Sequence, residues 1–154
     1  MSLPLGAAEP APDKLPSAPA VTALASARVV IVQDPDATDA FRPRPEKIQT
    51  LVDRAITNLT GKSTVAAAWR SLVSTQDVVG LKVFSAPGPN SGTRPVVVAA
   101  VVEGLLKAGI APKKIIVWDK HSADLRLAGF FDLAKHYGIR VAGSGDAGYD
   151  EKFF

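Results

Sequence analysis

The chain has 154 residues, enough for one domain with its own core; 47% of them are apolar and 21% charged, an ordinary balance for a globular protein. The net charge of +3 comes from acidic and basic residues interspersed along the chain, so the chain lacks the clustered basic face that nucleic-acid binding requires. Because there is no cysteine, the chain itself can supply no disulfide, thiolate metal site or iron–sulfur cluster. No apolar run approaches the roughly 20 residues of a membrane-spanning helix.

The N-terminal segment, residues 1–27, is rich in Ala and Pro and has few large side chains. It can bury too little apolar surface to offset the entropy of ordering, and we therefore expect a flexible or polyproline-like leader. The segment does not have the pattern of a signal peptide, but its composition is typical of the region that follows a cleaved export signal. We expect an exported, periplasmic protein, with a cytoplasmic linker as the alternative.

Regular structure is expected directly after this leader. Val29–Val32 is a continuous apolar run, which predicts a short strand buried on both faces of a parallel sheet. After a loop rich in Asp and Pro, apolar residues recur at helical spacing over residues 45–60, and Gly61 is expected to end that helix. Ser63 or Thr64 is expected to cap a short second helix.

The second half of the chain alternates between expected strands and expected helices. This order indicates parallel strands joined by right-handed crossovers. The expected fold class is therefore α/β, a Rossmann-like layered parallel sheet with crossover helices, over residues 28–154. The expected strands are residues 77–84, 113–119 and 139–143, and the expected helices are residues 94–108 and 122–137.

The helix expected over residues 94–108 is apolar on almost all sides. Glu103 and Lys107 are four residues apart in the orientation that favours a surface ion pair, and the other faces should be covered. Four short strands offer limited cover, even with Trp69 and Trp118 both expected in the core. We therefore expect an incomplete domain, one half of a larger fold that a further segment or another subunit completes.

The first candidate site is the loop of residues 85–94, because ligands of open parallel sheets bind beyond the carboxyl ends of the strands. Thr93 is expected to cap the next helix, so that the amides of Gly92, Thr93 and Arg94 point outward, where the helix dipole favours negative charge. The Arg94 guanidinium suits a carboxylate or phosphate, and Ser91 belongs to the same rim. This pattern predicts binding of a small anionic molecule. A well-capped helix start with a solvated Arg is the alternative.

The second candidate site follows the strand expected at residues 113–119. His121 could act as a general base or bind a metal, and Asp119 could make a catalytic or binding contact. Lys120 could bind the same anion as the first site. The alternative is an ordinary helix start with His121 as a surface residue. With a single histidine in this loop, we expect no metal site.

Two further patterns are interpreted as structural. Residues 143–148 spell G-x-G-x-x-G, but no helix pattern follows, which favours a Gly-rich turn over a dinucleotide site. Asp34, Asp36 and Asp39 could bind a hard cation, but turn chemistry is the preferred interpretation. The sequence identifies no cofactor.

Blocks of sequence from about residue 48 to the end carry a family resemblance. Together they resemble the bacterial domain-of-unknown-function family 362, whose biochemical activity is not established. Its members look like longer proteins, often exported by the twin-arginine route or fused to ferredoxin-type iron–sulfur modules. Relatives usually have a polar residue, often Asn, where this chain has Phe84. The blocks read LTGKSTVAAAWRSL, DVVGLKVF, GTRPVVVAAVVEGLLKAGI, KIIVWDK, LRLAGF and GIRVAGSGDAGYDEKFF.

The resemblance implies that this chain is the N-terminal half of the family domain, that it is exported, and that any cluster would lie outside it. A weaker similarity, through Thr93-Arg94-Pro95 and Ile115–Val117, is to the nickel-dependent lactate racemase superfamily, and we treat it as architecture alone. We expect an exported α/β protein of unknown activity that binds a small anionic ligand, and we leave open whether it is an enzyme. In the first hypothesis it is an enzyme when complete, with Arg94 clamping the substrate and His121 or Asp119 moving a proton. The alternatives are a non-catalytic binding or assembly module and a redox-associated partner protein.

Overall fold

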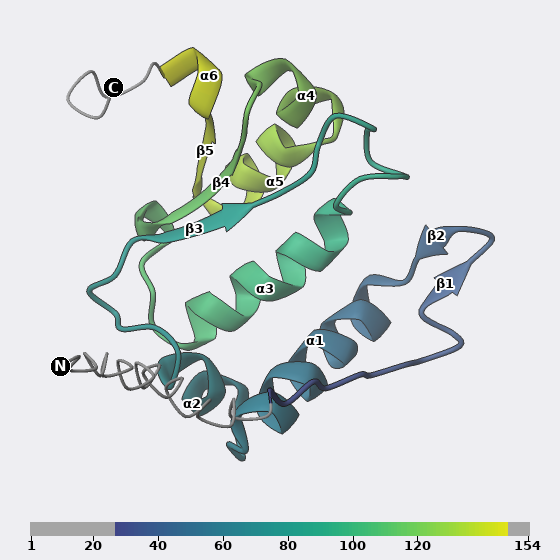
Figure 1. Ribbon diagram of the computed structural model, residues 1–154, viewed down its shortest axis with the longest axis vertical. Helices are drawn as coiled ribbons and strands as arrows, with labels where there is room; N and C mark the ends of the chain where they lie inside the picture. The colour runs from purple at the N-terminus through teal and green to yellow at the C-terminus, as the bar shows by residue number, and fades with distance from the viewer. Residues whose placement is uncertain (1–26, 148–154) are drawn as a thin grey trace, which may run out of the picture.

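The computed structural model describes residues 27–147 and has mixed α/β architecture (Figure 1). Its centre is a parallel sheet of three strands in the order β3–β4–β5. The strands are β3 (Val79–Lys82), β4 (Ile115–Asp119) and β5 (Arg140–Gly143), all within the expected ranges. The expected α/β class with parallel strands is confirmed. The expected leader lies outside the described residues except for Ala27.

Helices connect the strands as the alternation predicts. α3 (Pro95–Lys107) joins β3 to the short 3-10 helix η1 (Pro112–Lys114) and β4. The single helical stretch expected over residues 122–137 is wrong in one respect, because it forms two helices, α4 (Ser122–Leu127) and α5 (Phe130–Tyr137). Gly129 separates them with a φ of 88°, a conformation that interrupts the helical path.

The core lies between one face of the sheet and helices α3, α4 and α5. Ile115 and Val117 of β4 are fully buried there, as expected for alternate residues of a strand with one covered face. Trp118 points to the opposite face and is 37% exposed, so its expected place in the core is wrong. Its indole lies over Gly80, which has no side chain to keep it away. The helical residues of the core include Val98, Val102, Leu105, Leu125, Phe130 and Leu133.

The first two helices follow the sequence patterns closely. α1 (Pro45–Thr60) starts with Pro45 and ends at Gly61, which has a φ of 68°. α2 (Val65–Arg70) is capped by Thr64, whose hydroxyl accepts a hydrogen bond of 3.2 Å from the Ala67 amide. Both helices pack against α3, so that α3 lies between them and the sheet (Figure 1).

The strand expected at Val29–Val32 is wrong. This segment is extended but is assigned to no strand, and the side chains of Val29 and Ile31 are 79% and 78% exposed. It leads into a small antiparallel ribbon, β1 (Thr38–Asp39) and β2 (Arg42–Pro43). An apolar run shows that a segment is suited to burial, but a strand forms only where a neighbouring backbone is within reach.

The expected ion pair between Glu103 and Lys107 is also wrong. Glu103 accepts a hydrogen bond of 2.8 Å from the Tyr137 hydroxyl of α5, and Lys107 lies 3.6 Å from the Asp53 carboxylate of α1. Both side chains connect α3 to other helices, because α3 is a central helix and not a surface one.

Candidate functional site

The loop between β3 and α3 is closed by its own hydrogen bonds. The Phe84 amide donates to the Thr93 hydroxyl over 2.9 Å, and the Thr93 amide donates to the Phe84 carbonyl over 2.8 Å. The Gly92 amide donates to the Gly88 carbonyl over 3.2 Å. A Cβ atom at Gly92 would overlap the Phe84 carbonyl oxygen, so the loop requires glycine at this position.

These bonds correct two expectations for the loop. Thr93 is not the helix cap, because the N-cap residue of α3 is Arg94 and no side chain caps that helix. The amides of Gly92 and Thr93 do not point outward to an anion, because both already bind carbonyl groups. Glycine and threonine therefore shape this loop, and the chemistry of a site must come from its side chains.

The Arg94 side chain faces a cavity of about 620 Å³ between this loop and the β1–β2 ribbon. Its Nη1 atom donates a hydrogen bond of 2.9 Å to the Phe41 carbonyl in the ribbon. A second arginine, Arg42, also lines this cavity. Two arginines, an amide and a hydroxyl give the cavity donors suited to carboxylate or phosphate oxygens. The residues that line it are Ala40, Phe41, Arg42, Asn90, Ser91 and Arg94.

The ribbon wall of this cavity has an unusual turn. β1 and β2 are joined by only Ala40 and Phe41, and both have positive φ, 43° and 67°. A two-residue turn of this kind normally uses Asn or Gly, and each L-residue held in the left-handed region costs about 1–2 kcal/mol. The strained turn directs the Phe41 carbonyl at Arg94, an arrangement of the kind found at binding sites.

Asp119 lies elsewhere and serves a different purpose. Its carboxylate is buried at the end of β4 and accepts bonds of 2.8 Å from the Ser85 amide and 2.6 Å from the Ser85 hydroxyl. The Lys82 ammonium and the Lys120 amide each donate to its other oxygen over 2.8 Å. Burial alone raises the pKa of Asp119, but these donors outweigh burial and hold the pKa well below its usual value. The carboxylate thus ties β3, its loop and β4 together.

His121 and Lys120 form a third group, beside the short helix α6 (Ser144–Ala147). His121 is an exposed residue at the start of α4, and the Lys120 carbonyl accepts a bond of 2.8 Å from the Gly145 amide. The Ser122 amide donates to the Asp146 carboxylate over 2.8 Å. Hydrogen bonds from Ser122 lower the pKa of Asp146, and the neighbouring His121 adds to this effect.

The sequence-predicted residues therefore fall into three places. Ser91 and Arg94 line the cavity, Gly92 and Thr93 shape its loop, and Asp119, Lys120 and His121 are not among the residues that line it. The G-x-G-x-x-G segment begins at the end of β5 and continues into α6 up to residue 147, while its last glycine lies outside the described residues.

Sequence reasoning missed Arg42, Phe41 and Asn90. Asn90 lies within residues 85–94, the first candidate site, so its position in the sequence indicated a role in binding. Arg42 and Phe41 belong to a loop separated from Arg94 by about fifty positions, and the contact between residues 41 and 94 spans 53. Only the folded arrangement of α1 against α3 brings the ribbon to this loop.

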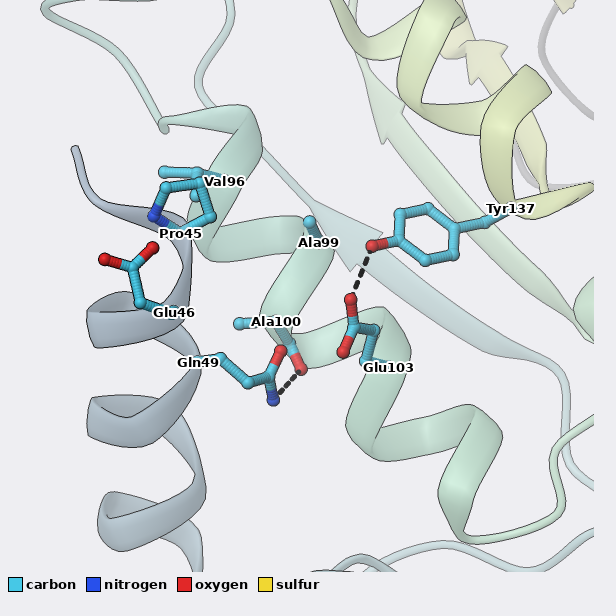
Figure 2. Close-up of a pocket in the computed structure, with 8 residues that line it drawn as sticks. All are labelled: Pro45, Glu46, Gln49, Val96, Ala99, Ala100, Glu103 and Tyr137. Atoms are coloured by element: carbon cyan, nitrogen blue, oxygen red, sulfur yellow. Dashed lines mark hydrogen bonds between the residues drawn. The ribbon is translucent and has the colours of Figure 1, made fainter. Parts of the chain in front are cut away.

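A second cavity, of about 270 Å³, lies between α1 and α3 (Figure 2). Figure 2 shows the Tyr137 hydroxyl directed at Glu103 and the Gln49 amide directed at the Ala100 carbonyl, over 2.8 and 3.4 Å. Burial, together with the bond to Glu103, raises the pKa of Tyr137 to about 12. Because Gln49, Glu103 and Tyr137 already have hydrogen-bond partners in the protein, we interpret this cavity as a feature of helix packing.

The aspartates before α1 show the turn chemistry that the sequence favours. Asp34 accepts a bond of 2.9 Å from the Asp36 amide and pairs with Lys47 at 3.3 Å, and Asp39 pairs with Arg44 at 3.5 Å. Over residues 27–147, no group of three His, Cys, Asp or Glu side chains is placed to hold a metal ion. In the same part of the chain, no helix is long and apolar enough to cross a membrane.

Comparisons with known proteins give no further assignment. No family model, no curated protein and no solved structure matches this chain.

Proposed function

We propose that this protein binds a small anionic molecule, a carboxylate or a phosphate, in the cavity between the β1–β2 ribbon and the β3–α3 loop. The observation that carries the proposal is the presence of two arginine residues, Arg42 and Arg94, in the lining of one cavity of about 620 Å³. A planar guanidinium presents paired N–H donors that match the two oxygens of a carboxylate or phosphate. Asn90 and Ser91 add neutral donors on the loop side.

The size of the cavity suits a metabolite-sized ligand, because small-molecule sites usually measure about 300–1,000 Å³. Arg94 is already held by the Phe41 carbonyl, so its side chain loses little freedom when an anion binds. An anion would add to this contact or replace it, since a guanidinium has five N–H donors.

Binding is better supported than proton transfer by the predicted pair Asp119 and His121. Asp119 is held as a carboxylate by four donors, and a group with a strongly lowered pKa is a weak base near neutral pH. The family resemblance, the Rossmann-like assignment, export and a redox association stay predictions that rest on the sequence alone.

Thermal unfolding in the presence of defined anions tests the proposal. Inorganic phosphate, acetate and succinate would each be compared with chloride at matched ionic strength, so that screening is equal. An anion at a concentration one hundred times its dissociation constant stabilises the fold by about 2.7 kcal/mol, or roughly 10 °C in melting temperature for a domain of this size. Arg94→Ala and Arg42→Ala should each abolish most of this shift.

Arg140→Ala is the matched control, because Arg140 is an exposed arginine at the start of β5 and lines none of the cavities described above. The control variant should keep the full shift. If none of the anions raises the melting temperature more than chloride does, or if the control loses the shift as the Arg94 variant does, the proposed site is wrong.

A further inference from the structure

The cavity proposed above to bind an anion has one arginine from each of its two walls. Arg42 is the first residue of β2 in the ribbon, and Arg94 is the last residue of the loop before α3. The Arg94 Nη1 atom joins the two walls through its bond of 2.9 Å to the Phe41 carbonyl. A ligand in the cavity therefore lies between cationic residues of two separate elements.

No acidic side chain balances these two charges. The residues that line the cavity include neither Asp nor Glu. Asp39, next to the ribbon turn, pairs instead with Arg44 at 3.5 Å. Over residues 27–147, neither Arg42 nor Arg94 takes part in an ion pair. Two arginines and no carboxylate give the lining an excess of positive charge, and a cleft lined by charges of one sign concentrates ligands of the opposite sign.

The bond to the ribbon does not satisfy Arg94. A backbone carbonyl is a neutral acceptor, so the Phe41 carbonyl leaves the charge of Arg94 in place. The bond also uses only one of the five N–H donors of the guanidinium. The other donors can make the paired bonds that a carboxylate or phosphate accepts. Arg42, in the lining of the same cavity, carries a second guanidinium.

The cavity is also larger than a single anionic group requires. Its volume of about 620 Å³ equals the space of about 20 water molecules in the liquid. Inorganic phosphate has five non-hydrogen atoms and would leave most of this space to water. Ala40 and Phe41 add apolar residues to the ribbon wall, and Asn90 and Ser91 add polar residues to the loop wall. The lining thus suits an anion that carries a non-ionic body.

We propose that the ligand of this cavity is a dianion with a non-ionic body, either a phosphate monoester or a dicarboxylate. Its two negative charges match the two arginines, whereas a monoanion would leave one cation without a partner. Both classes of ligand supply the same chemistry, which is charged oxygens for two guanidinium groups. This inference rests on the anion site proposed above and adds the class of anion that the site selects.

Probes that differ by one charge measure this selectivity. Methyl phosphate and dimethyl phosphate form one pair, and succinate and its monoamide, succinamate, form the other. At pH 8 the first member of each pair carries about two negative charges and the second carries one. In calorimetric titrations of the full chain at fixed ionic strength, at least one dianion should bind about tenfold or more tightly than its partner, because a bond to a charged group is worth about that factor. The pair with the larger ratio identifies the preferred class, phosphate monoester or dicarboxylate.

Substitution of Arg42 separates selectivity from binding. Arg42 is exposed, so Arg42→Ala should fold as the wild type does, and circular dichroism checks this. Because Arg94 remains, the preference for the dianion over the monoanion should fall to about threefold or less, the value of a single exposed charge contact. Arg42→Lys retains the charge and should retain more of the preference than Arg42→Ala does. Arg140→Ala is again the matched control and should keep the selectivity of the wild type.

The possible results distinguish this inference from the anion site itself. Equal affinities within both pairs, with binding that Arg94→Ala abolishes, would leave the anion site standing and refute the dianion. If none of the probes binds, both proposals are wrong. A dianion preference that survives in Arg42→Ala would show that the second cation is not Arg42. Glycerol 3-phosphate should bind more tightly than methyl phosphate, and equal affinity of these two monoesters would contradict the non-ionic body.

Discussion

Substitution of Asp119 by Asn should destabilise the fold without changing its shape. The Asp119 carboxylate accepts four hydrogen bonds, from the Ser85 amide and hydroxyl, the Lys82 ammonium and the Lys120 amide, over 2.6–2.8 Å. Asparagine has nearly the same volume but only one acceptor oxygen, and its NH₂ group faces donors. About half of the four bonds are therefore lost, and at least one NH₂ proton meets another donor.

The size of the loss follows from the positions of the lost partners. Ser85 is 1% exposed, so a lost bond from it leaves a buried polar group unpaired, which costs about 1.5–3 kcal/mol where the acceptor is charged. The Lys82 side chain is 52% exposed and can bind water instead, so its share is at most about 1 kcal/mol. Together, the expected loss of unfolding free energy is about 2–4 kcal/mol.

The pH dependence gives an independent check of the sign. Because the pKa of Asp119 is lower in the folded state than its ordinary value of 3.8, its stabilisation is complete above that value and is lost as pH falls below it. The difference in stability between wild type and Asp119→Asn should be constant near neutral pH and should shrink under acidic conditions, since a protonated carboxyl resembles the amide.

Urea unfolding followed by tryptophan fluorescence measures both quantities. The exposed Asp36 provides the control, and Asp36→Asn should change stability by no more than about 0.5 kcal/mol. A cost below about 1 kcal/mol for Asp119→Asn, or a difference from wild type that does not shrink in acid, would refute the role of Asp119 as a buried structural carboxylate.

Two further substitutions test how α3 packs. Gly104→Ala should destabilise the fold by about 0.5–2 kcal/mol, because a methyl group would overlap the Trp69 indole at a cost of about 1–3 kcal/mol, more than the helix propensity of alanine returns. Trp69→Phe in the same chain should recover part of this loss in urea unfolding, and a more stable Gly104→Ala single variant would contradict the close contact. Tyr137→Phe should cost about 1 kcal/mol through the lost bond to Glu103. Ultraviolet difference titration of the wild type against this variant should place the pKa of Tyr137 near 12. The stabilisation from Tyr137 is therefore complete below its ordinary pKa of 10.0 and is lost as the pH rises towards 12. A titration of Tyr137 at its ordinary pKa would show that the bond to Glu103 is absent in solution.

Local patterns were enough to predict most of the elements. Gly61 ends α1 and Thr64 caps the start of α2, so both helix ends are set by residues close in the sequence. In β4, Ile115, Val117 and Asp119 are buried, as the alternation of side chains along a strand predicts. The errors have tertiary causes. The 28–33 segment has the apolar run of a strand, but no neighbouring backbone in the described part of the chain pairs with it. Trp118 has the composition of a core residue, but no helix in the described part of the chain covers its face of the sheet.

The candidate site was predictable only on one side, for the same reason. Arg94 and Ser91 follow a strand, so the rule for parallel sheets finds them from the sequence. Arg42 lies well beyond the end of the strand expected at Val29–Val32 and belongs to the β1–β2 ribbon, so the rule gives no signal for it.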